Sequence, residues 1–205
     1  MGVTPSNSVM CAGLPCADVR HGSFAVPGVE VDPGRVYVVL ISEAAPADPE
    51  DHYYSPGDPL FLRTTLQAFR DAGESVESAS DILGLGVYMT TAVKCGKTGY
   101  AINTSTVKEC SVLLERELEL FPSIRAYLPM GDVAKRALNC IAVRQGLKRV
   151  IPAGSTYRIR AEKYFYKGAR VFPSYLQAGP SFFIEKSKRR MIEEDIRAAM
   201  ALVRD

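Results

Sequence analysis

The chain has 205 residues, of which 47% are hydrophobic and 23% are charged, and its formal net charge is +2. This length and composition predict a single domain, residues 1–205, with a core of its own. No run approaches the roughly 20 apolar residues of a membrane helix, so a membrane-spanning protein is excluded at this stage. The charge neither requires nor excludes nucleic acid, because the distribution of charge matters more than its sum.

Four short apolar or β-branched runs predict buried strands, and an amphipathic helix is expected after each. The strands are predicted at 35–42, 86–93, 124–131 and 169–173. The helices are predicted to begin near residues 58, 106, 132 and 185. A hairpin is expected within 150–170, and residues 1–30, rich in Gly, Pro and Ser, are expected to run over the surface.

Polar residues indicate where two of these helices begin. Asp58 followed by Pro59 predicts an N-cap and a first-turn proline. Thr106 and Glu109 have the spacing of a capping box. Both helices are therefore expected to be capped by their own sequence.

Strands that alternate with helices indicate parallel βαβ units. The predicted fold class is α/β, a three-layer α/β/α sandwich with a central, about four-stranded parallel sheet. Ligands bind such sheets at the carboxyl ends of the strands. Those ends fall at 42–50, 91–97, 129–132 and 172–176, where we expect the functional site.

The segment Gly96-Lys97-Thr98 has the letters that end a phosphate-binding loop. Such a loop needs a glycine five positions earlier, so that backbone N–H groups can curl around a phosphate. Thr91 stands there instead, inside a predicted strand. We therefore expect no nucleotide loop and interpret Lys97 as a solvated loop lysine.

The start of the chain lacks the features of a signal peptide, so we expect a cytoplasmic protein. We also expect the protein to be a monomer.

Cysteines in a reducing compartment are more often free, catalytic or metal-bound than disulfide-bonded. Cys140 lies in an apolar helical pattern and is interpreted as a small buried hydrophobe. The other four are candidate metal ligands: Cys11, Cys16, Cys95 and Cys110. Four thiolates can hold zinc or an iron–sulfur cluster, and their spacing does not decide between the two.

Five stretches, in order over residues 11 to about 200, resemble motifs of the uracil-DNA glycosylase superfamily and of its iron–sulfur branch in particular. They are "LISEAAPADPED" (40–51), "VYMTTAVKC" (87–95), "ECSVLLERELELF" (109–121), "LPMGDVAKRAL" (128–138) and "VFPSYL" (171–176). The resemblance implies one domain of that fold, with a cysteine-bearing N-terminal segment over residues 1–30.

The same resemblance implies a [4Fe–4S] cluster held by Cys11, Cys16, Cys95 and Cys110. The first pair is separated by four residues, which is wider than the two residues usual in that branch. The cluster is expected to be structural, tying the N-terminal segment and the 95–110 loop to the sheet.

The resemblance further implies a protein that flips a base out of DNA and cleaves its bond to deoxyribose. The residues that would form the base pocket are Ala45, Pro46, Phe61, Thr91, Phe172 and Ser174, with Phe61 as the stacking aromatic. Phe172 stands where the family has an anion-stabilising histidine, and Thr91 where it has a base-reading asparagine. Phe172 donates no hydrogen bond, and a hydroxyl lacks the fixed donor and acceptor of a carboxamide. We therefore expect an altered base preference or a loss of catalysis.

Carboxylates after the first strand are the candidate catalytic groups. Glu43 and Asp48, with Glu50 nearby, are expected to hold the attacking water, and backbone N–H groups around 46–48 are expected to support the base. The alternative is a solvated acidic loop. His21 and His52 lie outside the motifs and are interpreted as surface histidines.

The segment after the last strand is expected to face DNA. Tyr175 and Leu176 are candidate wedges into the duplex. Phosphate contacts are predicted for Lys186, Lys188 and Arg189. The alternative is a solvated helix start, because three acidic residues follow at 193–195.

The sequence thus leads to three hypotheses. The first is a divergent iron–sulfur DNA glycosylase that removes uracil or another deaminated or damaged base. The second is a catalytically inactive module of the same fold that binds nucleic acid or a nucleotide. The third is a nucleosidase-like hydrolase that acts on a free metabolite.

Overall fold

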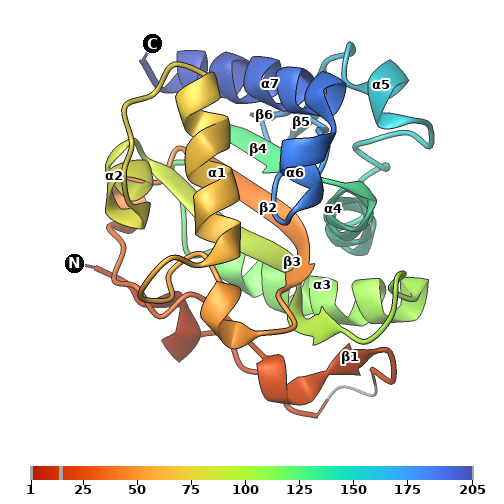
Figure 1. Cartoon of the computed structure of the whole chain (residues 1–205). Helices are drawn as coiled ribbons and strands as arrows, with labels where there is room; N and C mark the ends of the chain where they lie inside the picture. The colour runs from red at the N-terminus through yellow and green to blue at the C-terminus, as the bar shows by residue number, and fades with distance from the viewer. Residues whose placement is uncertain (1, 14–15, 205) are drawn as a thin grey trace.

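A mixed sheet of six strands runs through the middle of the protein, in the order β1-β3-β2-β4-β6-β5 (Figure 1). The computed structural model describes residues 2–13 and 16–204. The strands are β1 (Val19–Arg20), β2 (Val38–Ala45), β3 (Val87–Lys97), β4 (Ala126–Pro129), β5 (Tyr164–Tyr166) and β6 (Ala169–Val171). The four central strands are parallel, and β1 and β5 add a short antiparallel edge at either side. The predicted α/β sandwich is therefore confirmed, including its four-stranded parallel centre and the hairpin of β5 and β6.

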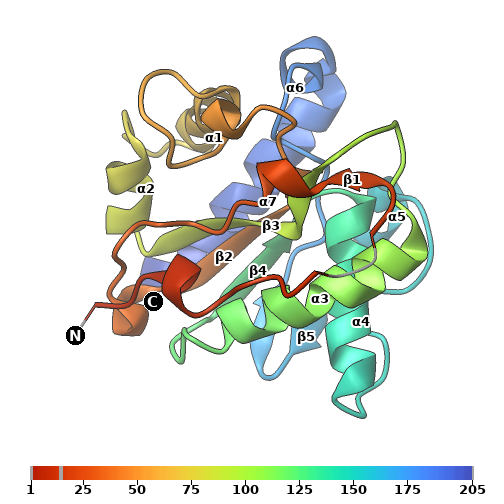
Figure 2. The same ribbon diagram turned by 90° about the horizontal axis from the view of Figure 1, so that it is seen from below.

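Helices cover both faces of this sheet. They are α1 (Leu60–Asp71), α2 (Ala79–Gly84), α3 (Thr104–Leu118), α4 (Asp132–Arg144), α5 (Thr156–Ile159), α6 (Ser181–Ile184) and α7 (Lys186–Arg204), with short 3-10 turns at Pro5–Asn7, His21–Ser23, Pro33–Arg35 and Pro49–Asp51. Figures 1 and 2 show α1, α2 and α7 on one face and α3 and α4 on the other. Within the described residues, no helix is both long and apolar enough to cross a membrane.

Consecutive residues of β2 enter two different cores. Val39 and Ile41 pack with α3, α4 and the N-terminal segment. Val38 and Leu40 pack with α1, α2 and α7. A strand covered on both faces has no polar side, which is why its sequence is continuously apolar.

The predicted self-capping of α1 and α3 is wrong. The cap position of α1 is Pro59 and not Asp58, and the first backbone N–H of the helix donates to Asp51 Oδ1 at 3.1 Å. The hydroxyl of Thr106 donates to Asp18 Oδ1 at 2.5 Å, so it forms no capping box with Glu109. Both carboxylates come from segments outside the helices, and they satisfy donors that the helix cannot satisfy itself.

A buried ion pair joins β3 to α3. Lys94 and Glu117 form a salt bridge although neither side chain is exposed to solvent. Glu117 Oε1 also accepts hydrogen bonds from the hydroxyls of Tyr88 at 2.6 Å and Thr90 at 2.9 Å. Burial and the charge of Glu117 raise the pKa of Tyr88 well above its usual value, so that Tyr88 remains a hydrogen-bond donor. The acid is thus surrounded by donors from one strand.

Replacing Glu117 with Gln should lower the free energy of unfolding by about 3–5 kcal/mol, because the ammonium of Lys94 is then buried without a counter-charge. Adding Lys94→Met should recover part of that loss, because it removes the buried ammonium that has no counter-charge. The Gln carbonyl still accepts the hydrogen bond from Tyr88. Denaturant unfolding measures both effects. Asp58→Asn, at the exposed pair with Arg63, is the control and should change stability by less than about 1 kcal/mol. Equal losses at the two sites would contradict this account of the buried pair.

Candidate functional site

Glu43 lies half-buried at the carboxyl end of β2, against the first turn of α4. Its Oε1 accepts the backbone N–H of Val133 at 3.2 Å, and the positive end of the helix dipole favours a carboxylate at this place. Gly131 precedes the helix with φ +91°, and a Cβ there would lie 2.5 Å from Glu43 Oε1. The glycine therefore leaves the room that the carboxylate occupies, and Glu43 is held at the predicted edge of the sheet.

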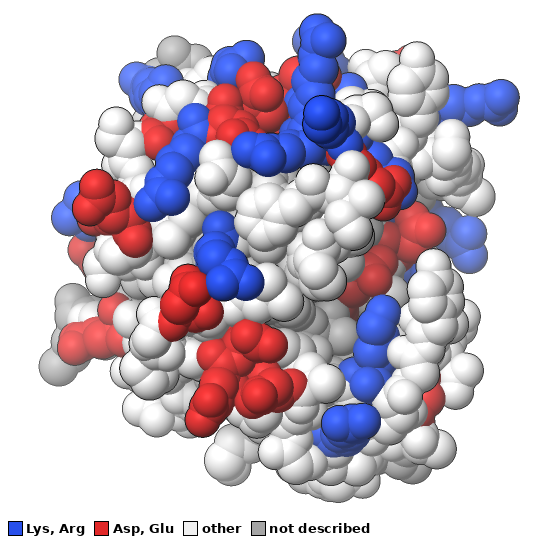
Figure 3. Space-filling model, viewed as in Figure 1, with Lys and Arg blue, Asp and Glu red and all other residues white. Residues whose placement is uncertain are grey.

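Asp48 has a different environment. It is exposed at the start of the turn Pro49–Asp51, and its Oδ1 accepts the backbone N–H of Glu50 at 3.0 Å. Figure 3 shows acidic side chains gathered low on this face, over the segment that follows β2. Of the two predicted catalytic carboxylates, Glu43 is therefore the one fixed at the sheet edge, whereas Asp48 shapes an exposed turn.

The predicted base-pocket residues lie at the same edge of the sheet but are largely covered. Four are buried, namely Ala45, Pro46, Thr91 and Ser174, and two are half-buried, namely Phe61 and Phe172. The hydroxyl of Ser174 donates to Asp195 Oδ2 at 2.6 Å, which ties it to α7. The guanidinium of Arg170 lies 4.6 Å from the ring centroid of Phe172. Ser174 therefore supports α7.

A buried polar network lies beside Thr91, on the α1 side of the sheet. Ser42, the partner of Thr91 in the β2–β3 register, bonds to the hydroxyl of Tyr53 at 2.6 Å. The amide of Gln177 donates to the same hydroxyl at 2.9 Å and to Thr65 at 3.3 Å. Within the described residues, Thr91 Oγ1 and Gln177 Oε1 have no hydrogen-bond partner although both are buried. His52 Nε2 is a third such atom in the described part of the chain. Buried polar atoms are normally paired, so each of the three is a place where a water or a ligand would bind.

His52 is buried, so its interpretation as a surface histidine is wrong. It packs edge-to-face on Tyr53 with ring centroids 5.5 Å apart. Burial and the positive charge of Lys94 lower the pKa of His52 to about 4, so the ring is neutral at pH 7. His21 is exposed as predicted, and its Nε2 lies 3.0 Å from the carbonyl oxygen of Cys16. The sequence around His52 has no motif that signals burial. The burial of His52 depends on tertiary contacts, which the local sequence does not show.

The two predicted wedge residues are partly covered. Tyr175 and Leu176 are half-buried and pack against the core beneath α1 and α7. Phe183 and Ile184, at the end of α6, are instead 44% and 76% exposed. These two apolar side chains reach further into solvent than Tyr175 and Leu176. The sequence around them has no polar–apolar repeat that would have predicted their exposure.

The three cations predicted to bind phosphate differ in whether they form ion pairs within the protein. Arg189 forms an ion pair with Asp71, donating from Nη2 to Oδ1 at 2.7 Å. Lys188 pairs with Glu185 at 2.5 Å, whereas Lys186 is exposed. Figure 3 shows Lys and Arg side chains along the upper rim of this face, over α7, with acidic ones among them. The charge that Lys186 contributes is therefore freer to meet a phosphate than that of Arg189.

The four candidate ligand cysteines come together on the α3 side of the sheet, under the N-terminal segment. Cys16, Cys95 and Cys110 are buried and Cys11 is half-buried. Burial, and then the negative charge of the other three thiolates, raise the pKa of Cys95 to about 12. The backbone N–H of Lys94 donates to Cys110 Sγ at 3.2 Å, which puts that sulfur beside the residue that precedes Cys95.

The chemistry of this donor set fits an iron–sulfur cluster. Burial raises the pKa of Cys16, Cys95 and Cys110, so these thiols are costly to deprotonate without a cation nearby. An iron–sulfur cluster takes four thiolates. Within residues 2–13 and 16–204, no group of three or more His, Cys, Asp or Glu side chains is arranged to hold a metal ion.

Cys140 differs from its interpretation as a buried hydrophobe. It is half-buried and lines a cavity between α3 and α4. Its sequence pattern is helical and apolar, but the adjoining loop leaves this part of the helix surface open.

Comparison with known families gives one match. The family model described as Uracil DNA glycosylase superfamily matches residues 29–197. A comparison with curated proteins finds no match for the chain. The matched range includes every strand of the parallel centre and the segment after β6.

The buried His52 should make the protein sensitive to acid. Its pKa of about 4 lies below the unfolded value of about 6.5, so its contribution to stability is complete above pH 6.5 and is lost as the pH falls towards 4. The loss should be about 3 kcal/mol. Urea unfolding between pH 4 and 7 of wild type and His52→Asn measures it, and the variant should lack this component. The control His21→Asn should follow the wild type, and parallel curves for all three proteins would refute the assignment.

Proposed function

Because the chain belongs to the uracil DNA glycosylase superfamily, we propose that it is an iron–sulfur DNA glycosylase with a shifted base preference. Its substrate would be DNA that contains uracil or another deaminated or damaged base, such as hypoxanthine or xanthine. The observation that carries the proposal is Glu43, a carboxylate fixed at the carboxyl ends of the parallel strands by the N-terminus of α4.

The reaction breaks the bond between the base and C1′ of deoxyribose. Positive charge develops on the sugar and negative charge on the leaving base, and water adds its hydroxyl to C1′ while its proton is passed on. In this proposal the carboxylate of Glu43 stabilises the sugar cation, orients the water and accepts its proton. Glu43 Oε1 is bound to Val133, so the second carboxylate oxygen is the one that would meet the water.

The shifted preference follows from the groups that would meet the base. Phe172 offers a ring face but no donor, so the negative base would depend on the backbone N–H groups of Ala47 and Asp48, because Pro46 has none. Thr91 Oγ1 and Gln177 Oε1 are buried polar atoms that lack a partner in the described part of the chain, and they would read the base edge. A hydroxyl and a carboxamide oxygen present a different pattern from a single asparagine, which supports a base other than uracil as the preferred one.

DNA would approach along α6 and the start of α7. Phe183 and Ile184 are apolar and exposed, which suits insertion between base steps, and Lys186 follows at once. Tyr175 and Leu176 lie behind them and would support this surface from below. The acidic segment around Asp48 would repel phosphates, which favours the α7 side for the backbone.

The four cysteines Cys11, Cys16, Cys95 and Cys110 would hold a [4Fe–4S] cluster with a structural role. When bound, the cluster would supply a cross-link between the N-terminal segment, β3 and α3. The site of base cleavage uses other residues, so no step of the reaction is assigned to the cysteines.

A second function, a DNA-binding module without catalysis, is favoured by one observation. Phe172, where the family has a histidine, donates no hydrogen bond, and the guanidinium of Arg170 over its ring already donates to backbone carbonyls of Tyr164, Val171 and Glu162. The loss of an oxyanion donor lowers rates about 100- to 1,000-fold in other enzymes.

Excision assays on oligonucleotides with uracil, hypoxanthine or xanthine test the proposal. Any excision found should fall at least about 100-fold in Glu43→Gln, because the amide cannot accept a proton but still accepts the N–H of Val133. Asp48→Asn is the matched control and should stay within a few-fold of wild type. Full activity of Glu43→Gln would remove Glu43 from the mechanism. Salt-sensitive DNA binding without excision of any base would favour the second function.

The cysteine assignment has a readout of its own. Protein purified without oxygen should be brown and contain about four iron and four sulfide per chain. Cys95→Ser and Cys110→Ser should lose the colour and most of the iron, whereas Cys140→Ser should retain both. Colourless protein that contains zinc, or equal iron in all three variants, would contradict the cluster.

A further inference from the structure

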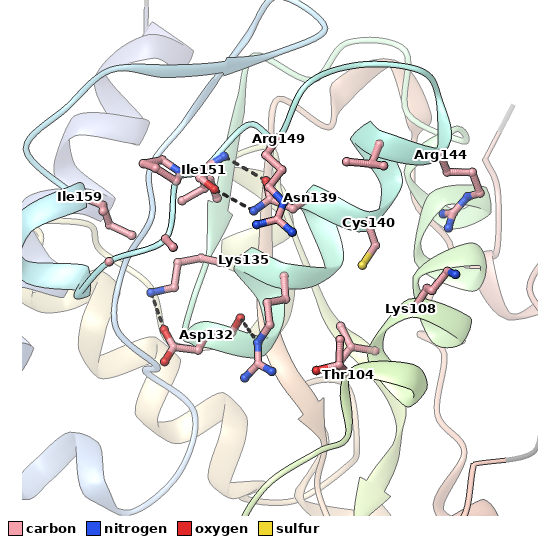
Figure 4. Close-up of a pocket in the computed structure, with 16 residues that line it drawn as sticks. Thr104, Lys108, Asp132, Lys135, Asn139, Cys140, Arg144, Arg149, Ile151 and Ile159 are labelled. Atoms are coloured by element: carbon pink, nitrogen blue, oxygen red, sulfur yellow. Dashed lines mark hydrogen bonds and ion pairs between the residues drawn. The ribbon is translucent and has the colours of Figure 1, made fainter.

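A cavity of about 780 Å³ lies between α3, α4 and the loop that follows α4 (Figure 4). This volume is in the range of pockets that bind small molecules. Its mouth begins near Thr104 and Asp132, at the first residues of the two helices, and it extends to Val143 and Arg144 at the end of α4. Its lining does not include Glu43 or any other residue assigned to base excision.

Hydrogen bonds hold the walls of the cavity in place. The amide of Asn139 donates to the carbonyl of Ile151 at 2.8 Å and accepts the N–H of Ile151 at 3.0 Å, which ties the loop to α4. Arg144 bonds to Glu115 and to the hydroxyl and carbonyl of Ser111, which ties α4 to α3. These bonds fix α3, α4 and the loop relative to one another, so binding would require little reorganisation.

The cavity carries positive charge that the protein does not neutralise. Lys108, Arg136 and Arg149 line it from α3, α4 and the loop, and none has an acidic partner within the part of the chain described. The buried Lys135 adds an ammonium that bonds to Asp132 at 2.7 Å and to Thr156 at 2.5 Å. Two of its three N–H donors are thus used, and one is left.

The floor of the cavity is apolar. Val107, Ile151 and Ile159 are buried side chains from three different segments that meet beneath the cations. Val143 at the rim is 53% exposed. A bound apolar group would cover this side chain and remove its apolar surface from water. A nucleobase would find few partners here, because both ends of the Asn139 amide are already bonded to the loop.

We propose that this cavity binds a small organic anion with an apolar body, an acyl or aryl carboxylate, sulfonate or phosphate, rather than a nucleotide. The acid group lies among Lys108, Arg136 and Arg149, and the apolar part covers Val107 and Ile151. Charge-assisted hydrogen bonds from two arginines orient the anion, and burial of the tail supplies the rest of the affinity. This site is independent of base excision and stands or falls separately from it.

The fluorescent anion anilinonaphthalene sulfonate is a suitable probe, with decanoate, deoxyuridine monophosphate and inorganic phosphate as competitors. We expect one probe to bind per chain and decanoate to displace it better than either phosphate compound. Cys140 lines the cavity and reports on occupancy, since bound probe or decanoate should slow its alkylation by N-ethylmaleimide, as followed by peptide mass spectrometry.

The double variant Arg136→Gln/Arg149→Gln should weaken probe binding at least about tenfold. Lys186→Gln/Arg190→Gln on α7 makes the same charge change away from the cavity and should stay within about twofold of wild type. All four positions are exposed, so the fold is not at risk. Equal binding by the two double variants, or unchanged alkylation of Cys140 at saturating probe, would overturn the proposal. Displacement by the nucleotide in preference to decanoate would overturn the class of ligand.

Discussion

A lysine and a glutamate without solvent contact form an ion pair that joins β3 to α3. The positions of Cys95 and Cys110 depend on this ion pair. Lys94 and Glu117 are both fully buried, where either charge alone would be costly, and the pair is held in one arrangement by hydrogen bonds from Tyr88 and Thr90. Lys94 immediately precedes Cys95, and the helix that carries Glu117 also carries Cys110. The requirement to pair two charges therefore fixes the strand and the helix that bring these two sulfurs together. The charge of Lys94 also adds to burial, which is the larger cause, in lowering the pKa of His52 and keeping that ring neutral.

The first turn of α4 is used from two sides. The N–H of Val133 binds the carboxylate of Glu43 at the sheet edge, while Asp132 and Lys135 face the basic cavity. A helix N-terminus has free N–H groups and a positive dipole end, so it attracts anions wherever the chain leaves it accessible. On one side a residue of the protein itself occupies that position, with Gly131 making the space for it. Towards the cavity, the cationic side chains of Lys108, Arg136 and Arg149 line a space that a ligand can enter.

The site keeps the scaffold of its superfamily while its polar groups are redistributed. Phe172 gives an aromatic surface where a donor would be expected, and Gln177 brings a carboxamide from the segment after β6. The hydroxyl of Thr91 lies beside that carboxamide network, since Ser42 and Thr91 are partners in the register. Exchange of donors and acceptors at a fixed backbone changes which base can be held, because each base edge has its own pattern of both. If DNA binds as proposed, the mixed charges over α7 and the acidic segment after β2 limit where a duplex lies.

The order of strands and helices could be read from the sequence, because an apolar run and a helical repeat are local patterns. The parallel centre, the hairpin near residue 165 and the position of Glu43 at the end of β2 followed from them. The gathering of Cys95 and Cys110 followed from a family resemblance rather than from spacing. Only the tertiary structure decided that His52 is buried, that Asp18 and Asp51 cap helices to which they do not belong, and that Gln177 joins a network with Tyr53. Burial and hydrogen-bond partners depend on contacts between segments far apart in the chain, and a local pattern holds no information about them.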